Sequence, residues 1–286
     1  MRLRGTVCTI AVAALLNAIP PARAFDDTMY PDLAGQWLLI NLHVGGQIAF
    51  DSTKPWGRGQ EAPLTPEYQK IHEDSLADQA RGGQGRWYSG ESCMPAGMPA
   101  TMNGYNSFEF VVLPEVTYVL VEHNLPVHRR IYTDGRDWPR QVEPTYQGYS
   151  IGQWIDSDRK GRFDLLQVET RYLKGPRSLD PTGIPTHADN QSVVKERIFL
   201  DKADGQVLHD EITLIDHALT RPWTVLKSYR RNPDPHPVWR EENCPGVTLL
   251  QKIGSELYFK GADGNLLPTR KDQPPPDLRY FNQTRR

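Results

Sequence analysis

Hydrophobic and polar residues alternate along two neighbouring stretches of the chain, residues 191–200 and 207–216. In each stretch one face combines apolar side chains with acidic ones, which are Glu196 in the first stretch and Asp210 and Asp216 in the second. The apolar members of the two faces are Val194, Ile198, Leu200, Leu208, Ile212 and Leu214. Such alternation is typical of β-strands that bury one face. It predicts a β-hairpin that turns at Ala203-Asp204-Gly205, with the glycine at a positive φ.

The length of the hairpin loop follows from the requirement that the two apolar faces coincide. A three-residue loop places Glu196 opposite Ile212, whereas a loop of two or four residues sets each apolar face against polar residues. We therefore predict a three-residue loop with a glycine bulge. The same register places Arg197 opposite Glu211 on the outer face, where a cross-strand ion pair contributes roughly 0.2–1 kcal/mol.

The rest of the pattern predicts seven further strands, at residues 38–42, 108–113, 116–122, 127–133, 149–155, 163–172 and 223–230. One helix is predicted from Pro66 to Ala80, with Thr65 as its N-cap and Gly82-Gly83 beyond its end. About nine strands at short spacing indicate an all-β fold. We expect an antiparallel β-barrel or a strongly bent meander sheet, with one peripheral helix and long irregular segments.

The first 24 residues have the features of a secretory signal peptide. Arg2 and Arg4 precede an apolar run at residues 7–16, which is too short to span a membrane, and Ala22-Arg23-Ala24 provides a cleavage site. Cleavage after Ala24 leaves 262 residues in the periplasm or outside the cell, with 30 basic and 35 acidic side chains. The resulting net charge of −5 argues against nucleic acid or an anionic membrane as a partner.

The mature chain divides by composition into two parts. We expect a barrel domain over residues 25–231 and a proline-rich extension over residues 232–286, in which residues 249–258 add one edge strand at most. Two cysteines remain after cleavage, Cys93 and Cys244. In an oxidising compartment an even pair predicts one disulfide, which stabilises by up to about 5 kcal/mol on the chain-entropy account.

The acidic residues on the apolar faces are the first candidates for chemistry. Glu196 lies in the middle of a strand, and burying an unpaired carboxylate costs several kcal/mol. It is therefore either a structural partner of an inward-facing arginine or a ligand-binding or catalytic acid in a cavity. Arg129 is the arginine that would face inward if the apolar residues of its strand do. Alternatively, its run of basic residues forms a solvated face.

Histidines at positions 187, 209 and 217 raise the question of a metal site with Asp189 or Asp216. Their spacing matches no zinc pattern, and His209 falls on the outer face of its strand. We therefore expect neither a metal nor another cofactor. His187, in the loop before residue 191, is the best acid–base candidate. Its alternative role is that of a loop histidine bonded to the backbone.

Further side chains can orient or stack on a ligand if the inner face encloses a cavity. They are Arg136, Tyr132, Trp154, Asp210 and Trp223. A plain aromatic core is the alternative use of the three aromatic residues. The segment Gly148-Tyr149-Ser150-Ile151-Gly152 matches the G-x-S-x-G pattern, but a nucleophile elbow needs a strand, a turn and a helix. Here the segment continues as a strand, so its glycines indicate a bend or a close backbone approach.

Several segments resemble those of a family of secreted bacterial proteins for which no activity is established. They are PDLAGQW, PLTPEYQ, CMPAGMP, FEFVVLPEVTYVLVE, RRIYTDGR, GYSIGQW, HADNQSVVKERIFLDKADG and DHALTRPWTVLKSYRR, over residues 31–231. In addition, Gly35-x-Trp37 at the head of a first strand resembles the entry motif of lipocalin-type (calycin-type) barrels, in which the tryptophan closes the base. The resemblance implies a periplasmic, lipocalin-like β-barrel. It implies no activity.

Three functional hypotheses follow. The first is a periplasmic binding protein that holds a small apolar or aromatic molecule in a barrel cavity. The second is a periplasmic lyase, isomerase or hydrolase that uses His187 and Glu196 for acid–base chemistry in the same cavity. The third is an envelope structural or interaction protein that works through its proline-rich end. The sequence alone leaves open whether the chain is an enzyme.

Overall fold

The computed structural model describes most of the chain from Phe25 onward. The described residues are 25–40, 62–83, 85–86, 94–95, 97–103, 107–122, 127–175, 177–179, 183–239, 250–253 and 256–277. Within these ranges, none of the helices has the length and apolar character needed to cross a membrane. The predicted signal peptide and both cysteines of the predicted disulfide lie outside the described residues, so these expectations remain predictions.

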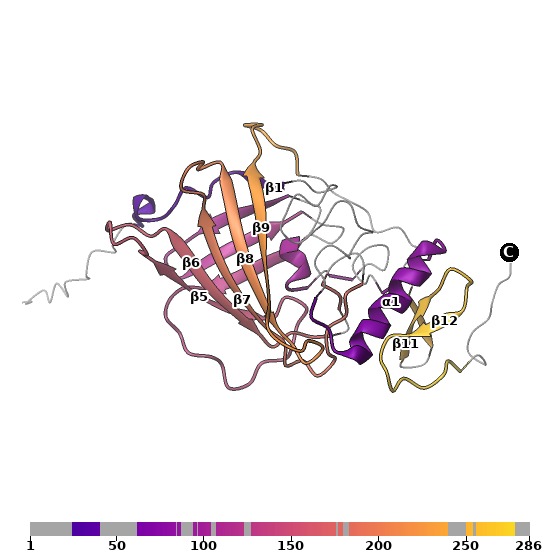
Figure 1. Cartoon of the computed structure of the whole chain (residues 1–286). Coiled ribbons are helices and arrows are strands. Elements are labelled where there is room, and N and C mark those ends of the chain that lie inside the picture. The colour runs from indigo at the N-terminus through magenta and orange to yellow at the C-terminus, as the bar shows by residue number, and fades with distance from the viewer. Residues whose placement is uncertain are drawn as a thin grey trace, which may run out of the picture.

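Nine strands form a closed barrel, as the alternation predicts. They are β1 (Gln36–Leu39), β2 (Phe108–Val112), β3 (Val116–Val121), β4 (Val127–Tyr132), β5 (Tyr149–Ile155), β6 (Leu165–Arg171), β7 (Val193–Leu200), β8 (Val207–Ile215) and β9 (Trp223–Arg231). Each strand pairs with the next in the sequence, and β1 pairs with β9 to close the ring, where Trp37 lies opposite Arg231. Figure 1 shows β5 to β9 along the near wall.

The barrel is mixed rather than antiparallel, which corrects one part of the sequence prediction. β4 and β5 run parallel, with Ile131 opposite Ser150 and Tyr132 opposite Ile151. Parallel neighbours need a long crossover, and residues 133–148 provide it. This segment is tied to the wall by a hydrogen bond of 3.0 Å from the Tyr172 hydroxyl to the Pro139 carbonyl. Strand alternation carries no information on direction, which explains why the sequence did not reveal this pairing.

The hairpin of β7 and β8 has the predicted register. Glu196 lies opposite Ile212, and Arg197 lies opposite Glu211, whose carboxylate it contacts at 3.2 Å. The predicted glycine bulge is wrong, because Gly205 does not have a positive φ. Two aspartates shape the turn instead. The Asp201 carboxylate accepts hydrogen bonds from the amides of Ala203 and Asp204, and the Asp204 carboxylate accepts one from the amide of Gln206. Such Asx-type hydrogen bonds stabilise a turn without a glycine at positive φ.

Aliphatic and aromatic side chains fill much of the barrel interior. Its fully buried members include Trp37, Phe108, Val119, Ile131, Leu166, Val194, Ile198, Leu208 and Tyr229. Trp37, near the start of β1, is fully buried, and its indole nitrogen donates to the Leu33 carbonyl at 3.0 Å. The guanidinium of Arg231 lies 4.6 Å from the centre of the Trp37 ring and donates to the Asp32 carbonyl at 2.7 Å. These contacts hold the segment that leads into β1, which begins with a 3₁₀ helix at Asp27–Met29, against the end of β9.

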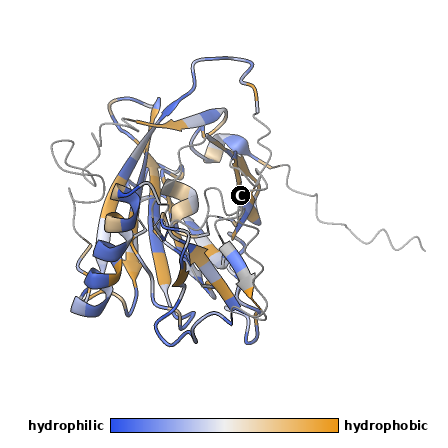
Figure 2. Ribbon diagram, turned by 90° about the vertical axis from the view of Figure 1, so that its right-hand side faces the viewer, coloured by the Kyte–Doolittle hydropathy of each residue, from blue (hydrophilic) through white to orange (hydrophobic). Residues whose placement is uncertain are grey.

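The one α-helix of the described residues, α1 (Pro66–Ala80), has the predicted bounds and begins with a proline after Thr65. The Thr65 hydroxyl, however, makes no capping hydrogen bond. The helix is mainly hydrophilic (Figure 2), and the residues that it buries are polar: His72, Ser75 and Asp78. The buried carboxylate of Asp78 accepts hydrogen bonds from the backbone amides of Gly85 and Ala262.

The C-terminal part contains a second sheet instead of the single predicted edge strand. β10 (Leu250–Ile253), β11 (Glu256–Lys260) and β12 (Leu266–Pro268) form three antiparallel strands apart from the barrel. Figure 1 shows α1 between this sheet and the barrel. An ion pair of 3.0 Å between Lys271 and Glu67 joins the end of the sheet to the helix. The prediction of one strand over residues 249–258 is therefore wrong: two strands begin within that stretch, and a third follows at Leu266–Pro268.

A candidate ligand site in the barrel interior

Two buried ionic groups meet across the barrel interior. Arg129 on β4 donates from Nη1 to Glu196 Oε1 at 2.8 Å and from Nη2 to Glu196 Oε2 at 2.5 Å. Both side chains are almost fully buried. The alternative in which Arg129 faces inward and neutralises Glu196 is therefore confirmed. A bidentate pair of this kind fixes orientation as well as charge.

Two hydroxyl groups complete the coordination of Arg129. Its Nε donates to Ser150 Oγ at 3.3 Å, and its Nη2 also donates to Thr170 Oγ1 at 2.8 Å. These hydroxyls are 2.8 Å apart and belong to β5 and β6. Every nitrogen of the guanidinium thus has an acceptor, so the group is a satisfied part of the wall. Glu196 has both oxygens engaged, which makes it a poor candidate for moving protons.

Asp210 on β8 differs from Glu196 in having no partner. The residue is 0% exposed, and neither carboxylate oxygen accepts a hydrogen bond from any described group. Burial, followed by the negative charge of Glu196, raises the pKa of Asp210 well above its usual range. A buried acceptor without a donor costs about 1–3 kcal/mol. The interior therefore contains one acidic group that a ligand with a hydrogen-bond donor can satisfy.

Two interior residues near Asp210 were missed by the sequence analysis. Lys227 on β9 is buried directly opposite Asp210 in the strand register. Tyr229 is buried two residues further on, and its hydroxyl donates to the Met102 carbonyl. Burial raises the pKa of Tyr229, and the Asp210 carboxylate raises it further. The alternation of β9 places both side chains on the inner face, so extending the hairpin register by one strand would have found them.

The two candidate tryptophans also belong to the interior wall. Trp154 is buried and donates from Nε1 to Thr117 Oγ1 at 3.3 Å, while Tyr30 packs edge-on against it with ring centres 5.3 Å apart. Trp223, at the start of β9, is half-buried and packs against the core. Both positions suit a wall residue that a bound molecule can contact.

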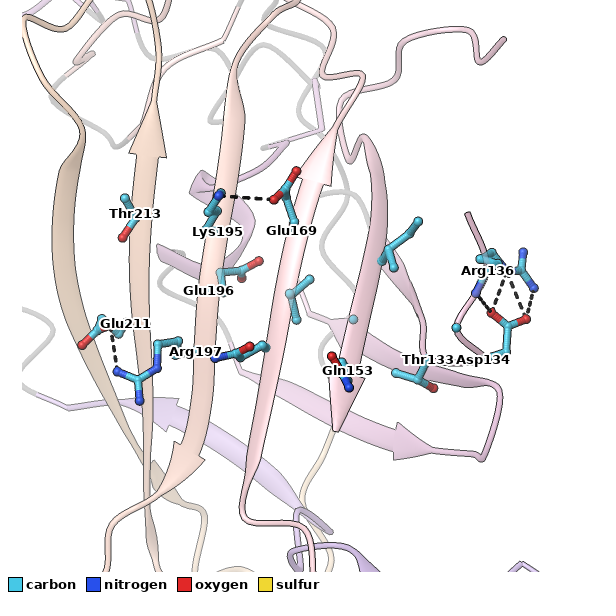
Figure 3. Close-up of a pocket in the computed structure, with 15 residues that line it drawn as sticks. Thr133, Asp134, Arg136, Gln153, Glu169, Lys195, Glu196, Arg197, Glu211 and Thr213 are labelled. Carbon is cyan, nitrogen blue, oxygen red and sulfur yellow. Dashed lines mark hydrogen bonds and ion pairs between the residues drawn. The ribbon is translucent and has the colours of Figure 1, made fainter. Parts of the chain in front are cut away.

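Tyr132 and Arg136 lie away from the interior. The Tyr132 ring stacks on Tyr149 at 5.0 Å, and the Arg136 guanidinium lies 3.8 Å from the centre of the Tyr132 ring. Arg136 also pairs with Asp134, whose pKa its guanidinium lowers through hydrogen bonds. Asp134 and Arg136 border an open outer pocket of about 920 Å³ across β5 to β8 (Figure 3).

That outer pocket is lined largely by charges that already have partners. Lys195 lies 3.5 Å from Glu169, and Arg197 contacts Glu211. Figure 3 shows these pairs as separate links between neighbouring strands. The outer pocket therefore offers polar contacts but no unpaired buried group. It is a weaker candidate for a ligand site than the interior around Asp210.

His187 lies in the loop before β7, and no described contact joins it to Glu196. Its backbone amide donates to the Asp216 carboxylate at 2.9 Å, and its ring packs 5.7 Å from that of Tyr68 on α1. Asp189 Oδ2 lies 3.1 Å from His187 Nδ1 and 2.5 Å from His217 Nδ1. The fold thus brings together three side chains of types that can ligate a metal, with one possible ligand atom of each within 4.8 Å of the others. Their spacing in the sequence matches no metal motif. His209, as predicted, lies on the outer face, where it bonds to Ser228.

The G-x-S-x-G segment is part of a strand, as its surroundings predict. Ser150 is buried on β5 and bonded to Arg129 and Thr170, so it lacks the exposed position of a nucleophile. A Cβ atom at Gly152 would lie 2.6 Å from Ile131 Cγ2 on β4. The glycine therefore permits the close approach of the two parallel strands.

The fold defines the class of protein: a closed, nine-stranded mixed β-barrel with one α-helix. Comparison of the chain with known protein families, with curated proteins and with solved structures gives no significant match. The site in the barrel interior therefore has to be interpreted from its own geometry.

Proposed function

We propose that this protein binds a small molecule in the interior of its barrel. The observation that carries the proposal is Asp210, which is 0% exposed and has two oxygens without a hydrogen-bond donor. A buried polar group of this kind needs a partner, and a ligand can supply it. The ligand we infer has an apolar or aromatic body and a hydroxyl, amide or amine group that donates to Asp210.

The dimensions of the barrel support a ligand of modest size. Barrels of eight strands are just wide enough to be filled by side chains or to hold one small ligand, and the diameter grows with strand number. Nine strands give a slightly wider ring. In the strand register, Tyr229 and Ile212 flank Asp210 and provide apolar contact, and Trp223 lies further along the same wall. Arg129 and Glu196 satisfy one another, so they set the shape of the site rather than bind the ligand.

We further propose that the barrel is lipocalin-like and works in the periplasm or outside the cell. Three features support the lipocalin-like fold: the closed barrel, the buried Trp37 near the start of β1, and the guanidinium of Arg231 over the indole ring of Trp37. The composition of residues 1–24 supports export. The enzyme hypothesis gains no support, because its two acid–base groups are not in contact and Glu196 is bound by Arg129.

Native mass spectrometry of the exported protein tests the proposal. We expect an organic molecule that stays bound under native conditions and is lost on denaturation. Asp210→Leu should lose it, because leucine has the same branching at Cγ but cannot accept the donor of the ligand. Glu211→Gln is the matched control, since it neutralises the adjacent carboxylate on the outer face and should retain the molecule.

Two results would contradict the proposal. One is an adduct that is equally abundant in wild type and in Asp210→Leu. The other is a wild type that carries no adduct and whose Tm is raised by no member of a panel of aromatic amines, alcohols and amides. In either case Asp210 would be a buried acid without a ligand.

A further inference from the structure

A second pocket, outside the barrel, lies between α1, the loop before β7 and the end of β12 with the residues that follow it. Its volume is about 680 Å³, which is within the usual range for small-molecule sites. Tyr68 and Ile71 of the helix line one side, Thr186 and His187 another, and Thr269 a third. Five basic and three acidic side chains also line it. The pocket is thus built by three separate parts of the chain.

Arg177 is the unusual member of this lining. Its side chain is 2% exposed, and among the described residues only Nη2 has a hydrogen-bond acceptor, the hydroxyl of Ser192. Nε and Nη1 are buried and have no acceptor in the described part of the chain. Burial lowers the pKa of Arg177 to about 10, so the guanidinium remains charged at neutral pH. Buried donors without acceptors are rare in folded proteins, and each one calls for an explanation.

The neighbouring carboxylate does not provide the missing acceptors. Asp216 lies 4.0 Å from Arg177 Nη2 and balances part of its charge. Its oxygens are already engaged, because they accept from the Ser192 hydroxyl and from the amides of His187 and Ala218. Asp216 therefore compensates for the charge of Arg177 but leaves the N–H groups of Nε and Nη1 unsatisfied.

The other charges around the pocket leave a net positive lining. Lys70 pairs with Asp74 at 3.1 Å, and Lys271 pairs with Glu67 at 3.0 Å, which neutralises two of the three acidic residues. Arg86 is half-buried, and its guanidinium has no ion-pair partner among the described residues. Two cationic groups, Arg86 and Arg177, are thus available to a negatively charged ligand.

We propose that this pocket binds a small molecule through a carboxylate or phosphate group, with Arg177 as the anchor. Oxyanions offer several acceptor oxygens, and guanidinium groups bind them with charge-assisted hydrogen bonds. Arg86 contributes charge from the side of the pocket, and Tyr68 and Ile71 contact the apolar part of the ligand. This proposal is independent of the one for the barrel interior, because it rests on the cation Arg177 rather than on the acid Asp210.

Titration with two simple oxyanions, inorganic phosphate and citrate, tests the proposal. The readout is the ¹H–¹⁵N spectrum of the arginine Nε–H groups in the full mature chain, with sodium chloride at matched ionic strength as the reference. We expect the Arg177 signal, identified by its absence in Arg177→Lys, to shift and saturate with either oxyanion but not with chloride. A carboxylate preference would favour citrate, and a phosphate preference would favour inorganic phosphate.

Variants decide whether the pocket is responsible. Loss of a charge-assisted bond should weaken oxyanion binding at least about tenfold in Arg177→Met, followed through the Arg86 Nε–H signal, and several-fold in Arg86→Gln, followed through the Arg177 signal. Arg140→Gln, which removes an exposed arginine outside the pocket, should bind as wild type does. The proposal is overturned if the Arg177 signal does not respond, or if Arg86→Gln and Arg140→Gln weaken binding equally. Arg86→Gln keeps the test valid even if Arg177→Met does not fold.

Discussion

Two arginines of this protein are buried to the same degree but have opposite hydrogen-bonding states. Arg129, inside the barrel, has an acceptor at every nitrogen, whereas Arg177, beside α1, has acceptors at only one. Burial alone therefore does not reveal what a charged residue does. A buried charge with all its hydrogen bonds made has a structural role, whereas one with unpaired donors or acceptors marks a place where a ligand can supply the missing partner.

The largest expected effect comes from breaking the satisfied group. Arg129→Met leaves Glu196 buried without its partner, so we expect the free energy of unfolding to fall by about 3–5 kcal/mol. Arg177→Met should change it far less, because that side chain has fewer hydrogen bonds to lose. Urea unfolding of both variants in oxyanion-free buffer measures the difference. Equal losses in the two variants would remove the distinction between the arginines.

A double substitution sharpens the interpretation of the first one. In Arg129→Met/Glu196→Leu both charges are absent, and we expect most of the stability lost in Arg129→Met to return. Replacing a buried ion pair by apolar residues is often neutral or stabilising by about 1–4 kcal/mol. Urea unfolding of the single and double variants measures this. A double variant that is as unstable as Arg129→Met would show that the hydroxyls of Ser150 and Thr170 need the guanidinium.

Asp210 extends the comparison to an unsatisfied acid, and its effect depends on pH. Because its pKa is raised in the folded state, the folded protein binds this proton more tightly than the unfolded chain, whose pKa is near 3.8. Stability from this group is therefore complete below that value and falls by about 1.4 kcal/mol per pH unit above it, until the folded pKa is passed. Asp210→Asn should lack this loss.

The measurement is urea unfolding of wild type and Asp210→Asn from pH 4 to pH 8. The variant should gain stability relative to wild type as the pH rises, while Glu211→Gln on the outer face should follow wild type. Parallel curves for wild type and Asp210→Asn would mean that Asp210 ionises normally, and the argument for a missing partner would fail.

The smallest effect is expected at an exposed ion pair that uses the same residue types. Arg197 and Glu211 lie next to the interior pair along β7 and β8 but face outward. Exposed pairs contribute roughly 0.2–1 kcal/mol and are screened by salt. Arg197→Ala should therefore lower the free energy of unfolding by no more than this, and 1 M salt should abolish the difference. A larger loss of unfolding free energy that does not depend on salt would show that the contribution of an ion pair depends more on its pairing than on its burial.

Much of the barrel could be predicted because strand alternation is a local signal. The period-two pattern fixed the faces of β7 and β8, and matching their apolar faces fixed the register that places Glu196 inside. The inward Arg129 followed from the same rule as one of two open alternatives. The direction of β5 did not follow, because a parallel and an antiparallel strand have the same alternation.

The second pocket could not be predicted for a related reason. Arg177 lies in a segment without periodicity, and its burial depends on α1 and on residues far along the chain. The grouping of His187, Asp189 and His217 likewise depends on a loop and a turn that only the closed barrel brings together. Tertiary contacts of irregular segments have no counterpart in local patterns, so both sites were visible only in the folded chain.

The strand pairings also predict how the ring comes apart. Within the described residues, two of its nine junctions have only two paired positions each, β1 with β2 and β4 with β5, whereas β5 to β9 pair over six to eight positions. The ring therefore divides into an arc of three strands, β2 to β4, and an arc of six. Arg129 is on the small arc and Glu196 on the large one, so their ion pair holds the two arcs together. Amide hydrogens at these two junctions should exchange with solvent well before those of β7 and β8, because the wall of the barrel should open there first.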